Sequence, residues 1–157
     1  MDIMEAITSR RSIRSYQDRP VEQDKLNLIL EAGRLAPSAR NLQDWRFVVV
    51  QDKDKRQELS TAARGQAFVA QAPVVIAACG TETEYVMTCG QHCYPIDVTI
   101  DRMSLMATDL GLGSCWIGAF YEDQVKQILG IPENIRVVTM LALAIRPRPL
   151  LLDHARG

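Results

Sequence analysis

A chain of 157 residues has the size of one domain and is long enough to bury a hydrophobic core. With 47% hydrophobic residues, 24% charged residues and a formal net charge of -1, the composition excludes broad electrostatic attraction to nucleic acid, so anions must bind at local clusters. The chain begins without a basic segment and apolar core of signal type, and no apolar run reaches the ~18 residues of a membrane span. We expect one cytoplasmic domain over residues 1–157, with four reduced cysteines.

The first predicted helix ends in a basic stretch. Apolar residues within positions 2–9 follow helical spacing, and residues 9–14 then read Ser-Arg-Arg-Ser-Ile-Arg. The guanidinium group of arginine can donate two parallel hydrogen bonds to phosphate oxygens, and serine hydroxyl groups can donate further ones. This stretch therefore indicates a binding site for an anion, which we call an anion clamp. The alternative is a solvated basic helix end, since cations near a helix C-terminus interact favourably with its dipole.

Four further elements are predicted before the middle of the chain. In order, they are a helix over 22–35, a strand over 46–51, a helix over 52–64 and a strand over 73–79. The first of these helices stops before Pro37, and a polar loop over 38–45 follows it. The run 73–79 is continuously apolar, which is typical of a strand buried on both faces. The segment 65–71 is too short for a helix or a strand to be assigned.

The second half opens with a predicted loop over 81–93. It continues with a core helix over 96–110, an extended piece over 115–120, a helix over 122–129 and a strand over 136–145. Gly111 and Gly113 are expected to end the core helix, and Gly130 with Pro132 to end the later one. Helices and strands do not alternate as in a doubly wound sheet, so we predict an α+β fold.

Two common nucleotide motifs are missing from the sequence. Residues 111–116 read Gly-Leu-Gly-Ser-Cys-Trp, with tryptophan where a dinucleotide fingerprint needs glycine, and they follow a helix instead of a strand. No phosphate loop ending in Gly-Lys-Ser or Gly-Lys-Thr is present. A Rossmann site is therefore not expected.

A cysteine and histidine cluster offers a different kind of site. Cys89, His92 and Cys93 lie within five residues and could bind zinc. A structural zinc site needs four ligands, which requires Cys79 or Cys115 to approach in the fold. The role of this cluster stays open.

Four polar segments together resemble the nitroreductase family of flavin enzymes, in the family's order and over nearly the whole chain. They are Arg-Arg-Ser-Ile-Arg-Ser-Tyr at 10–16, Ala-Pro-Ser-Ala-Arg-Asn-Leu-Gln-Asp-Trp at 36–45, Trp-Ile-Gly-Ala-Phe at 116–120 and Ile-Leu-Gly-Ile-Pro-Glu at 128–133. The resemblance implies a central mixed, mostly antiparallel sheet flanked by helices. It also implies an intertwined homodimer with FMN at the interface.

The activity implied by the resemblance is reduction of an electron-poor substrate, such as a nitroaromatic or a quinone, by NADH or NADPH. The implied mechanism is ping-pong hydride transfer at flavin N5, with no catalytic side chain. Neither the acceptor nor the choice between NADH and NADPH is predicted. The alternative is an FMN-binding carrier or redox partner without reductase activity of its own.

The resemblance also implies which residues bind the cofactor. The phosphate, ribityl and pyrimidine contacts match the basic stretch, at Arg10, Arg11, Ser12 and Arg14. The loop that reaches the flavin from the partner subunit matches Pro37, Ser38, Asn41 and Gln43. The segment whose backbone N–H faces flavin N5 matches Ile117, Gly118 and Ala119. Late basic residues that complete the phosphate shell match Arg146 and Arg148.

Three positions depart from the family pattern. Asp44 replaces a common proline and adds a charge beside the expected interface, and Ala144 stands where a glycine is usual. Only residues 150–157 follow the last predicted strand region, where many members continue into an arm that wraps the partner. We therefore expect a less interlocked dimer. The segment between Cys79 and Tyr94 is short, so we also expect a small lid and an open flavin face.

Overall fold

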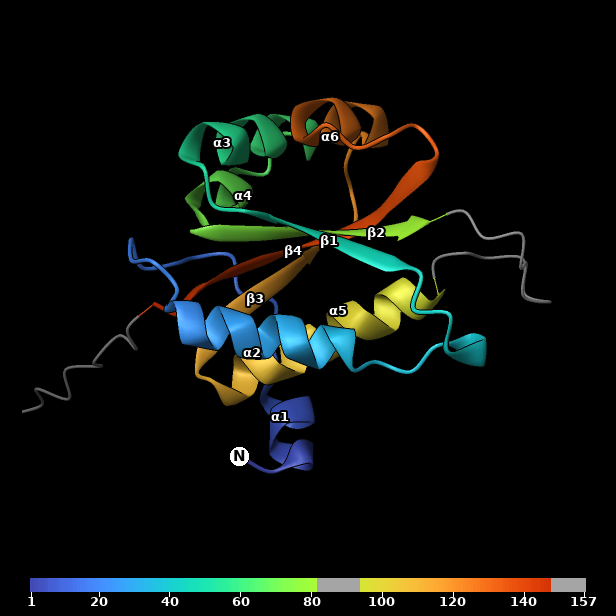
Figure 1. The fold of residues 1–157 in the computed structure, drawn as a ribbon. Coiled ribbons are helices and arrows are strands. Elements are labelled where there is room, and N and C mark those ends of the chain that lie inside the picture. Colours follow the sequence, from blue (N-terminus) through green and yellow to red (C-terminus); the bar gives the residue numbers. More distant parts are fainter. Residues whose placement is uncertain (82–93, 148–157) are drawn as a thin grey trace, which may run out of the picture.

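The computed structural model of the protein describes residues 1–81 and 94–147. In chain order its elements are α1 (Ile3–Ser9), α2 (Gln23–Arg34), the 3-10 helix η1 (Ala39–Asn41), β1 (Trp45–Val50), α3 (Lys53–Ala62), α4 (Ala67–Gln71), β2 (Val74–Thr81), α5 (Tyr94–Asp109), β3 (Leu112–Ile117), α6 (Glu122–Leu129) and β4 (Ile135–Ile145) (Figure 1). Each helix and strand that the sequence predicts is present within the described residues. The predicted α+β class is confirmed.

The strands form one sheet in the order β1-β2-β4-β3, and all three neighbouring pairs are antiparallel. An isolated parallel bridge joins Ser12 to Ser114 of β3, so the N-terminal stretch lies along the outer side of that strand. This pattern matches the predicted mixed, mostly antiparallel sheet. Its edges are β1 and β3.

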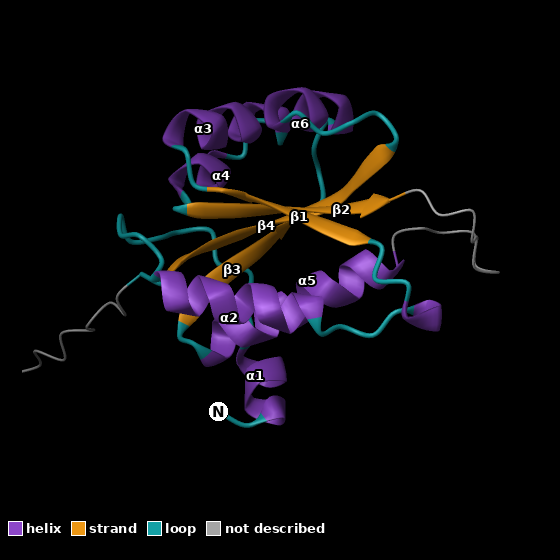
Figure 2. Cartoon of the chain, in the orientation of Figure 1, coloured by secondary structure: helices purple, strands orange, loops and turns teal. Residues whose placement is uncertain are grey.

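Helices cover both faces of the sheet (Figure 2). Alternate residues of β2 point to opposite sides: Val75 and Ala77 join the core beneath α3, α4 and α6, while Val74 and Ile76 join the core beneath α2 and α5. From Val74 to Gly80 every residue of β2 is buried, because the strand is central and covered on both faces. The continuous apolar run in the sequence therefore predicted this strand correctly.

Two glycines close helices as predicted, and a third does not. Gly111 and Gly130 adopt left-handed backbone, with φ of 76° and 66°, at the ends of α5 and α6. Gly113 was expected to help end α5, but it lies inside β3 opposite Ala144. A Cβ on Gly113 would lie 3.1 Å from the Ile13 side chain, so this glycine makes room for the N-terminal stretch. The extended piece accordingly starts at Leu112 and ends at Ile117, before Gly118.

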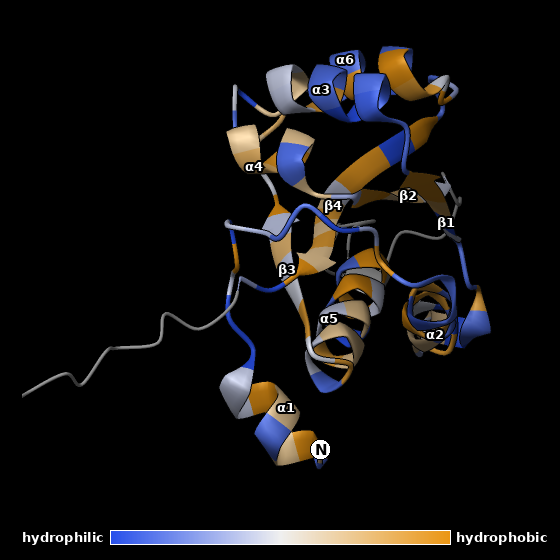
Figure 3. Ribbon diagram, turned by 90° about the vertical axis from the view of Figure 1, so that its left-hand side faces the viewer, coloured by the Kyte–Doolittle hydropathy of each residue, from blue (hydrophilic) through white to orange (hydrophobic). Residues whose placement is uncertain are grey.

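Helix α1 leaves most of its apolar face uncovered. A capping box between Asp2 and Glu5 starts the helix, and Ala6 is its one buried residue. Ile3 is 77% exposed and Met4 64% exposed. Figure 3 shows α1 projecting from the body of the chain with hydrophobic residues along it. Within the described residues, no helix combines the length and the apolar character needed to cross a bilayer.

Candidate functional site

The basic stretch predicted as an anion clamp lies against β3. The N–H of Ile13 donates to the carbonyl of Ser114 at 2.9 Å, beside the bridge between Ser12 and Ser114. Arg10 is the C-cap of α1 and is half-buried, whereas Ser12 and Arg14 are exposed. The backbone of the stretch is therefore fixed by β3, while the side chains of Ser12 and Arg14 stay accessible to solvent.

Arg11 also makes contacts of the kind that the helix-end alternative expects. Its Nη1 donates to the carbonyls of Thr8 at 2.7 Å and Arg10 at 2.8 Å. These carbonyls belong to the end of α1, where a cation is favoured. Arg11 thus stabilises the helix end, and its predicted cofactor contact stays a prediction.

Arg146 joins this edge from the end of β4. Its Nε donates to the carbonyl of Leu112 at 3.0 Å, and its own carbonyl accepts from the Gln17 side chain at 2.6 Å. A Cβ on Gly113 would lie 3.4 Å from Arg146 Cγ and 3.1 Å from Ile13. The structure therefore brings Arg146 beside the N-terminal stretch, while Arg148 lies outside the described residues.

A second layer of side chains supports Arg14. Its guanidinium carbon lies 5.9 Å from the centre of the Phe68 ring, and Tyr16 packs edge-on against the same ring at 6.5 Å. The Tyr16 hydroxyl donates to the carbonyl of Ile13 at 2.6 Å, which closes the backbone around Arg14. Burial raises the pKa of Tyr16, so the phenol stays protonated.

Cys115 lies beneath the same stretch. Burial raises the pKa of its thiol, and the charges of Arg14 and Arg10, with hydrogen bonds from Ser12 and Arg14, offset part of that rise. The thiol is therefore protonated near neutral pH. It packs under the arginines as a small neutral side chain.

The segment that follows β3 is open on one side and tied down on the other. Gly118 and Ala119 are exposed, and a Cβ built on Gly118 would meet nothing within 4 Å. Behind the segment, Gln66 Nε2 donates to the carbonyl of Ala119 at 3.1 Å, and the N–H of Tyr121 donates to the carbonyl of Ala62 at 2.9 Å. A flat group can approach the backbone here, and the backbone cannot easily retreat.

The predicted partner loop lies at the opposite edge of the sheet. It leads into β1, and three strand spacings of ~4.8 Å put β1 about 14 Å from β3; Figure 3 shows the two strands on opposite sides. Pro37, Asn41 and Gln43 are exposed, and Ser38 Oγ accepts from the N–H of Gln43 at 3.0 Å. One chain therefore does not bring this loop to the basic stretch.

Three residues of the same loop adopt backbone conformations that are energetically unfavourable for side chains other than glycine. Arg40 and Asn41 have φ of 54° and Gln43 has φ of 50°, all in the left-handed region. Each such residue costs on the order of 1 kcal/mol unless its surroundings favour that shape. An exposed, strained loop of polar residues is typical of a surface shaped for a binding partner.

A sequence model of the nitroreductase family matches residues 7–145. The chain belongs to the nitroreductase family. It is 32% identical to an NADH dehydrogenase of Thermus thermophilus over 91% of this chain and 86% of that protein. It is 33% identical to the FMN reductase [NAD(P)H] of Bacillus subtilis over 85% of this chain and 61% of that protein. The solved FMN-dependent nitroreductase of Clostridium difficile superposes with a TM-score of 0.83 at 30% identity, over 91% of this chain and 87% of that one.

The departure from the nitroreductase family pattern at Asp44 is buried. This residue is 9% exposed, and its backbone carbonyl accepts from both the N–H and the hydroxyl of Thr81. Among the described residues its Oδ1 has no hydrogen-bond partner. The charge expected beside the interface therefore points inward at the start of β1.

The cysteine cluster of this nitroreductase-family chain, Cys89, His92 and Cys93, lies outside the described residues. Both Cys79 and Cys115, its possible partners, are buried. Burial raises the pKa of Cys79 to about 11. Within residues 1–81 and 94–147, no group of three or more side chains of metal-ligand type is brought together.

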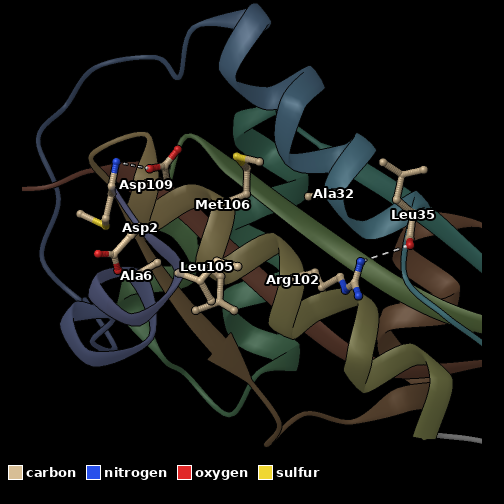
Figure 4. Close-up of a pocket in the computed structure, with 10 residues that line it drawn as sticks. Asp2, Ala6, Ala32, Leu35, Arg102, Leu105, Met106 and Asp109 are labelled. Carbon is tan, nitrogen blue, oxygen red and sulfur yellow. Dashed lines mark hydrogen bonds and ion pairs between the residues drawn. The ribbon is translucent and has the colours of Figure 1, made fainter.

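A hollow of about 360 Å³ lies between α1, α2 and α5 (Figure 4). Ala6, Leu35 and Leu105 line it, together with Arg102, which donates to the carbonyl of Leu35 at 3.3 Å. No residue predicted to bind the cofactor lines this hollow. It lies beneath the uncovered face of α1, on the side of the sheet away from α4.

Sequence patterns missed the residues that support the site from α4. Gln66 and Phe68 lie in the segment 65–71, which is too short for a helical period to be recognised. The available signal was local: a polar Gln follows Gly65 and precedes the apolar run Ala-Phe-Val-Ala. Nothing in that pattern points to Arg14 or Ala119, since both contacts join residues far apart in the chain.

Proposed function

We propose that this chain is one FMN-binding domain over residues 1–157 and forms a cytoplasmic homodimer. The dimer uses FMN to pass electrons from NADH or NADPH to a small electron-poor acceptor such as a nitroaromatic or a quinone. The observation that carries the proposal is the β3 edge, where the exposed basic stretch lies along the strand and the open backbone at Gly118 directly follows it. Relatives named as FMN reductase and FMN-dependent nitroreductase support the same cofactor.

The chemistry of the donors at this edge fits FMN. Arg10, Ser12 and Arg146 offer guanidinium and hydroxyl donors suited to a phosphate. From Ser114, beside the clamp, to Gly118 is four strand steps, or about 13 Å at ~3.3 Å per residue. This span separates a phosphate end from a ring end. The open side of Gly118 leaves room for a planar ring against the backbone.

When bound, FMN supplies the two-electron chemistry that links a nicotinamide donor to the acceptor. Arg14 would hold the pyrimidine end of the ring and supply a fixed cation there, and the backbone of the segment Ile117–Ala119 would supply an N–H donor to the ring. Tyr16 is half-buried and Cys115 is buried, and burial raises the pKa of both, so neither gives up a proton near neutral pH. Solvent therefore supplies the proton. The open face is one surface, so nicotinamide and acceptor occupy it in turn, in ping-pong order.

A homodimer explains two features that a single chain leaves unsatisfied. The apolar face of α1 and the hollow beside it are covered when a second copy packs there. The loop of Pro37, Ser38, Asn41 and Gln43 then reaches the β3 edge of the other subunit, as the family resemblance implies. The two halves of the site come from different chains.

Visible absorption spectra of the purified protein, recorded before and after anaerobic addition of NADH or NADPH, test this function. The expected result is a flavin spectrum that bleaches, followed by recovery when a quinone or nitroaromatic is added. A flavin spectrum that NADH and NADPH leave unchanged would identify a carrier instead of a reductase. Absence of flavin after incubation with FMN would refute the proposal. Double-reciprocal plots should be parallel, and converging lines would contradict the ping-pong order.

A further inference from the structure

The turn between α3 and α4 lies behind the β3 edge. This α3–α4 corner, residues 62–68, reverses the chain through two left-handed residues, Arg64 with φ of 59° and Gly65 with φ of 74°. Arg64 also lies over the Tyr121 ring, with its guanidinium carbon 5.4 Å from the ring centre. A non-glycine residue keeps a left-handed backbone conformation only when contacts with the surrounding structure hold it there. The corner is therefore a defined structure.

One end of the corner holds Arg14. Phe68 is 8% exposed, and the Arg14 guanidinium stacks over the ring at 5.9 Å. Tyr16 packs against the edge of the same ring and fixes its plane. An arginine so placed has fewer accessible orientations than a free surface arginine.

A second residue of the corner, Gln66, holds the segment after β3. Gln66 donates from Nε2 to the carbonyls of Ala63 at 2.8 Å and Ala119 at 3.1 Å. The Gln66 carbonyl accepts from Ser60 Oγ at 2.9 Å, so the residue is held on both sides. A single rigid turn thus contacts both the cation and the backbone that flank the proposed ring site.

We propose that Phe68 is a positioning residue that holds the Arg14 guanidinium at a set place relative to the Gly118 backbone, and thereby raises the reduction potential of FMN. This inference rests on the proposed function. Uptake of two electrons and one proton leaves the flavin with one negative charge, the electrons coming from NADH or NADPH. A cation already in place stabilises that charge without reorganisation, whereas a mobile cation must first be ordered.

The test compares four single variants and one double variant of the FMN-loaded protein by midpoint potential against a reference dye, a readout that needs no nicotinamide. Phe68→Leu keeps an apolar side chain but removes the ring, and Phe68→Tyr keeps the ring. Arg14→Gln removes the cation. The matched control is Val69→Ala, which opens the same core from the next position of α4, where Val69 is fully buried.

Phe68→Leu should lower the preference for reduced over oxidised flavin about threefold to fivefold, as for one partly exposed cation–π contact. Because tenfold is about 30 mV for a two-electron couple, the potential should fall by about 15 to 20 mV. Phe68→Tyr and Val69→Ala should keep the wild-type potential. In an Arg14→Gln background, Phe68→Leu should cause no further shift, because it acts through the cation.

An unchanged potential in Phe68→Leu, or an equal shift in Val69→Ala, would overturn the positioning role and leave the proposed function standing. The same holds for a shift that persists in the Arg14→Gln background. If the wild type binds FMN but NADH and NADPH do not reduce it, the reductase function fails, and the dye-measured potentials still decide the role of Phe68. A wild type that binds no FMN overturns both.

Discussion

The two edges of the sheet are built in opposite ways. At the β3 edge, hydrogen bonds join the basic stretch to Ser114, Arg146 to Leu112, and the segment after β3 to Gln66. At the β1 edge, the loop before the strand has hydrogen bonds from Gln43 to Ser38 and Asn41, is largely exposed, and holds three non-glycine residues at positive φ. One edge is braced by hydrogen bonds to distant parts of its own chain, and the other combines exposed polar side chains with strained backbone.

In the proposed homodimer, this difference separates the residues that act within one subunit from those that act on the partner. A side chain held by its own fold can be judged from a single chain, as with Arg14 over Phe68. A strained exposed loop is a place where a binding partner is expected to pack. Substitutions at the β3 edge should therefore act in every subunit separately, whereas substitutions at the β1 edge should act on the partner's site.

The largest effect is expected from removing the clamp with Arg10→Ala and Arg11→Ala together. Hydrogen bonds to charged groups contribute about 1.5 to 3 kcal/mol each, so FMN affinity should fall on the order of a hundredfold or more. Fluorescence titration with FMN measures this loss. Arg19→Ala, which removes an exposed arginine of the same N-terminal region, is the matched control. Unchanged affinity in the double variant would remove the clamp from the site.

The next effect concerns the face that a second copy should cover. Ile7 is 48% exposed on α1, and Ile7→Glu puts a charge where apolar contact is expected. Losing one buried isoleucine contact of about 1.5 to 3 kcal/mol should raise the dimer dissociation constant roughly tenfold to a hundredfold. Sedimentation equilibrium gives that constant, with Thr61→Glu on the exposed side of α3 as control. A dimer as tight as the wild type would place the interface elsewhere.

A smaller effect on FMN affinity is expected from a substitution in the β1-edge loop, with little effect on stability. Asn41→Gly removes a side chain from the β1-edge loop and suits its φ of 54°. The free energy of unfolding should stay within about 0.5 kcal/mol of the wild type. FMN affinity should fall about fivefold to tenfold, as for one lost hydrogen bond. Chemical denaturation and FMN titration measure the two quantities, and a loss of stability without loss of affinity would reverse the assignment.

The smallest expected effect is on stability, and it tests the hydrogen bonds that Glu122 accepts in the region beyond the β3 edge. Burial alone would raise the pKa of Glu122, but hydrogen bonds from Arg136 and the Val137 N–H outweigh it and hold the pKa below its ordinary 4.5. Its contribution to stability is therefore complete above pH 4.5 and is lost as pH falls through the lower folded-state pKa. Glu122→Gln should cost about 1 kcal/mol at neutral pH and decline less steeply in acid. Parallel stability curves in acid would exclude this role.

Local patterns predicted most of the fold because the elements carry local signals. Helix α6 was found within its observed bounds, since Gly130 marks its left-handed cap, and β2 was found from its unbroken apolar run. Gly113 was misread because a glycine that ends a helix and a glycine that makes room for Ile13 look alike in sequence. Helix α4 was missed because five residues show no complete period.

The candidate site was predictable only in part. The family resemblance named its segments, and the structure brings Arg146 to the basic stretch as that resemblance implies. The contacts of Phe68 with Arg14 and of Gln66 with Ala119 join residues more than fifty positions apart. Such contacts follow from how the layers pack, which spacing along the chain does not encode.

The most direct test of a site shared between subunits is complementation of FMN binding. The Arg10→Ala, Arg11→Ala variant and the Asn41→Gly variant are mixed by co-refolding, at an FMN concentration that loads about half of the wild-type sites and a much smaller share of either variant's sites. In each mixed dimer, one of the two sites then combines the intact basic stretch of the Asn41→Gly subunit with the intact loop of the Arg10→Ala, Arg11→Ala subunit. With random pairing, about a quarter of all sites should regain wild-type affinity. No recovery in dimers shown to be mixed would mean that each chain builds its site alone, and would contradict the shared site.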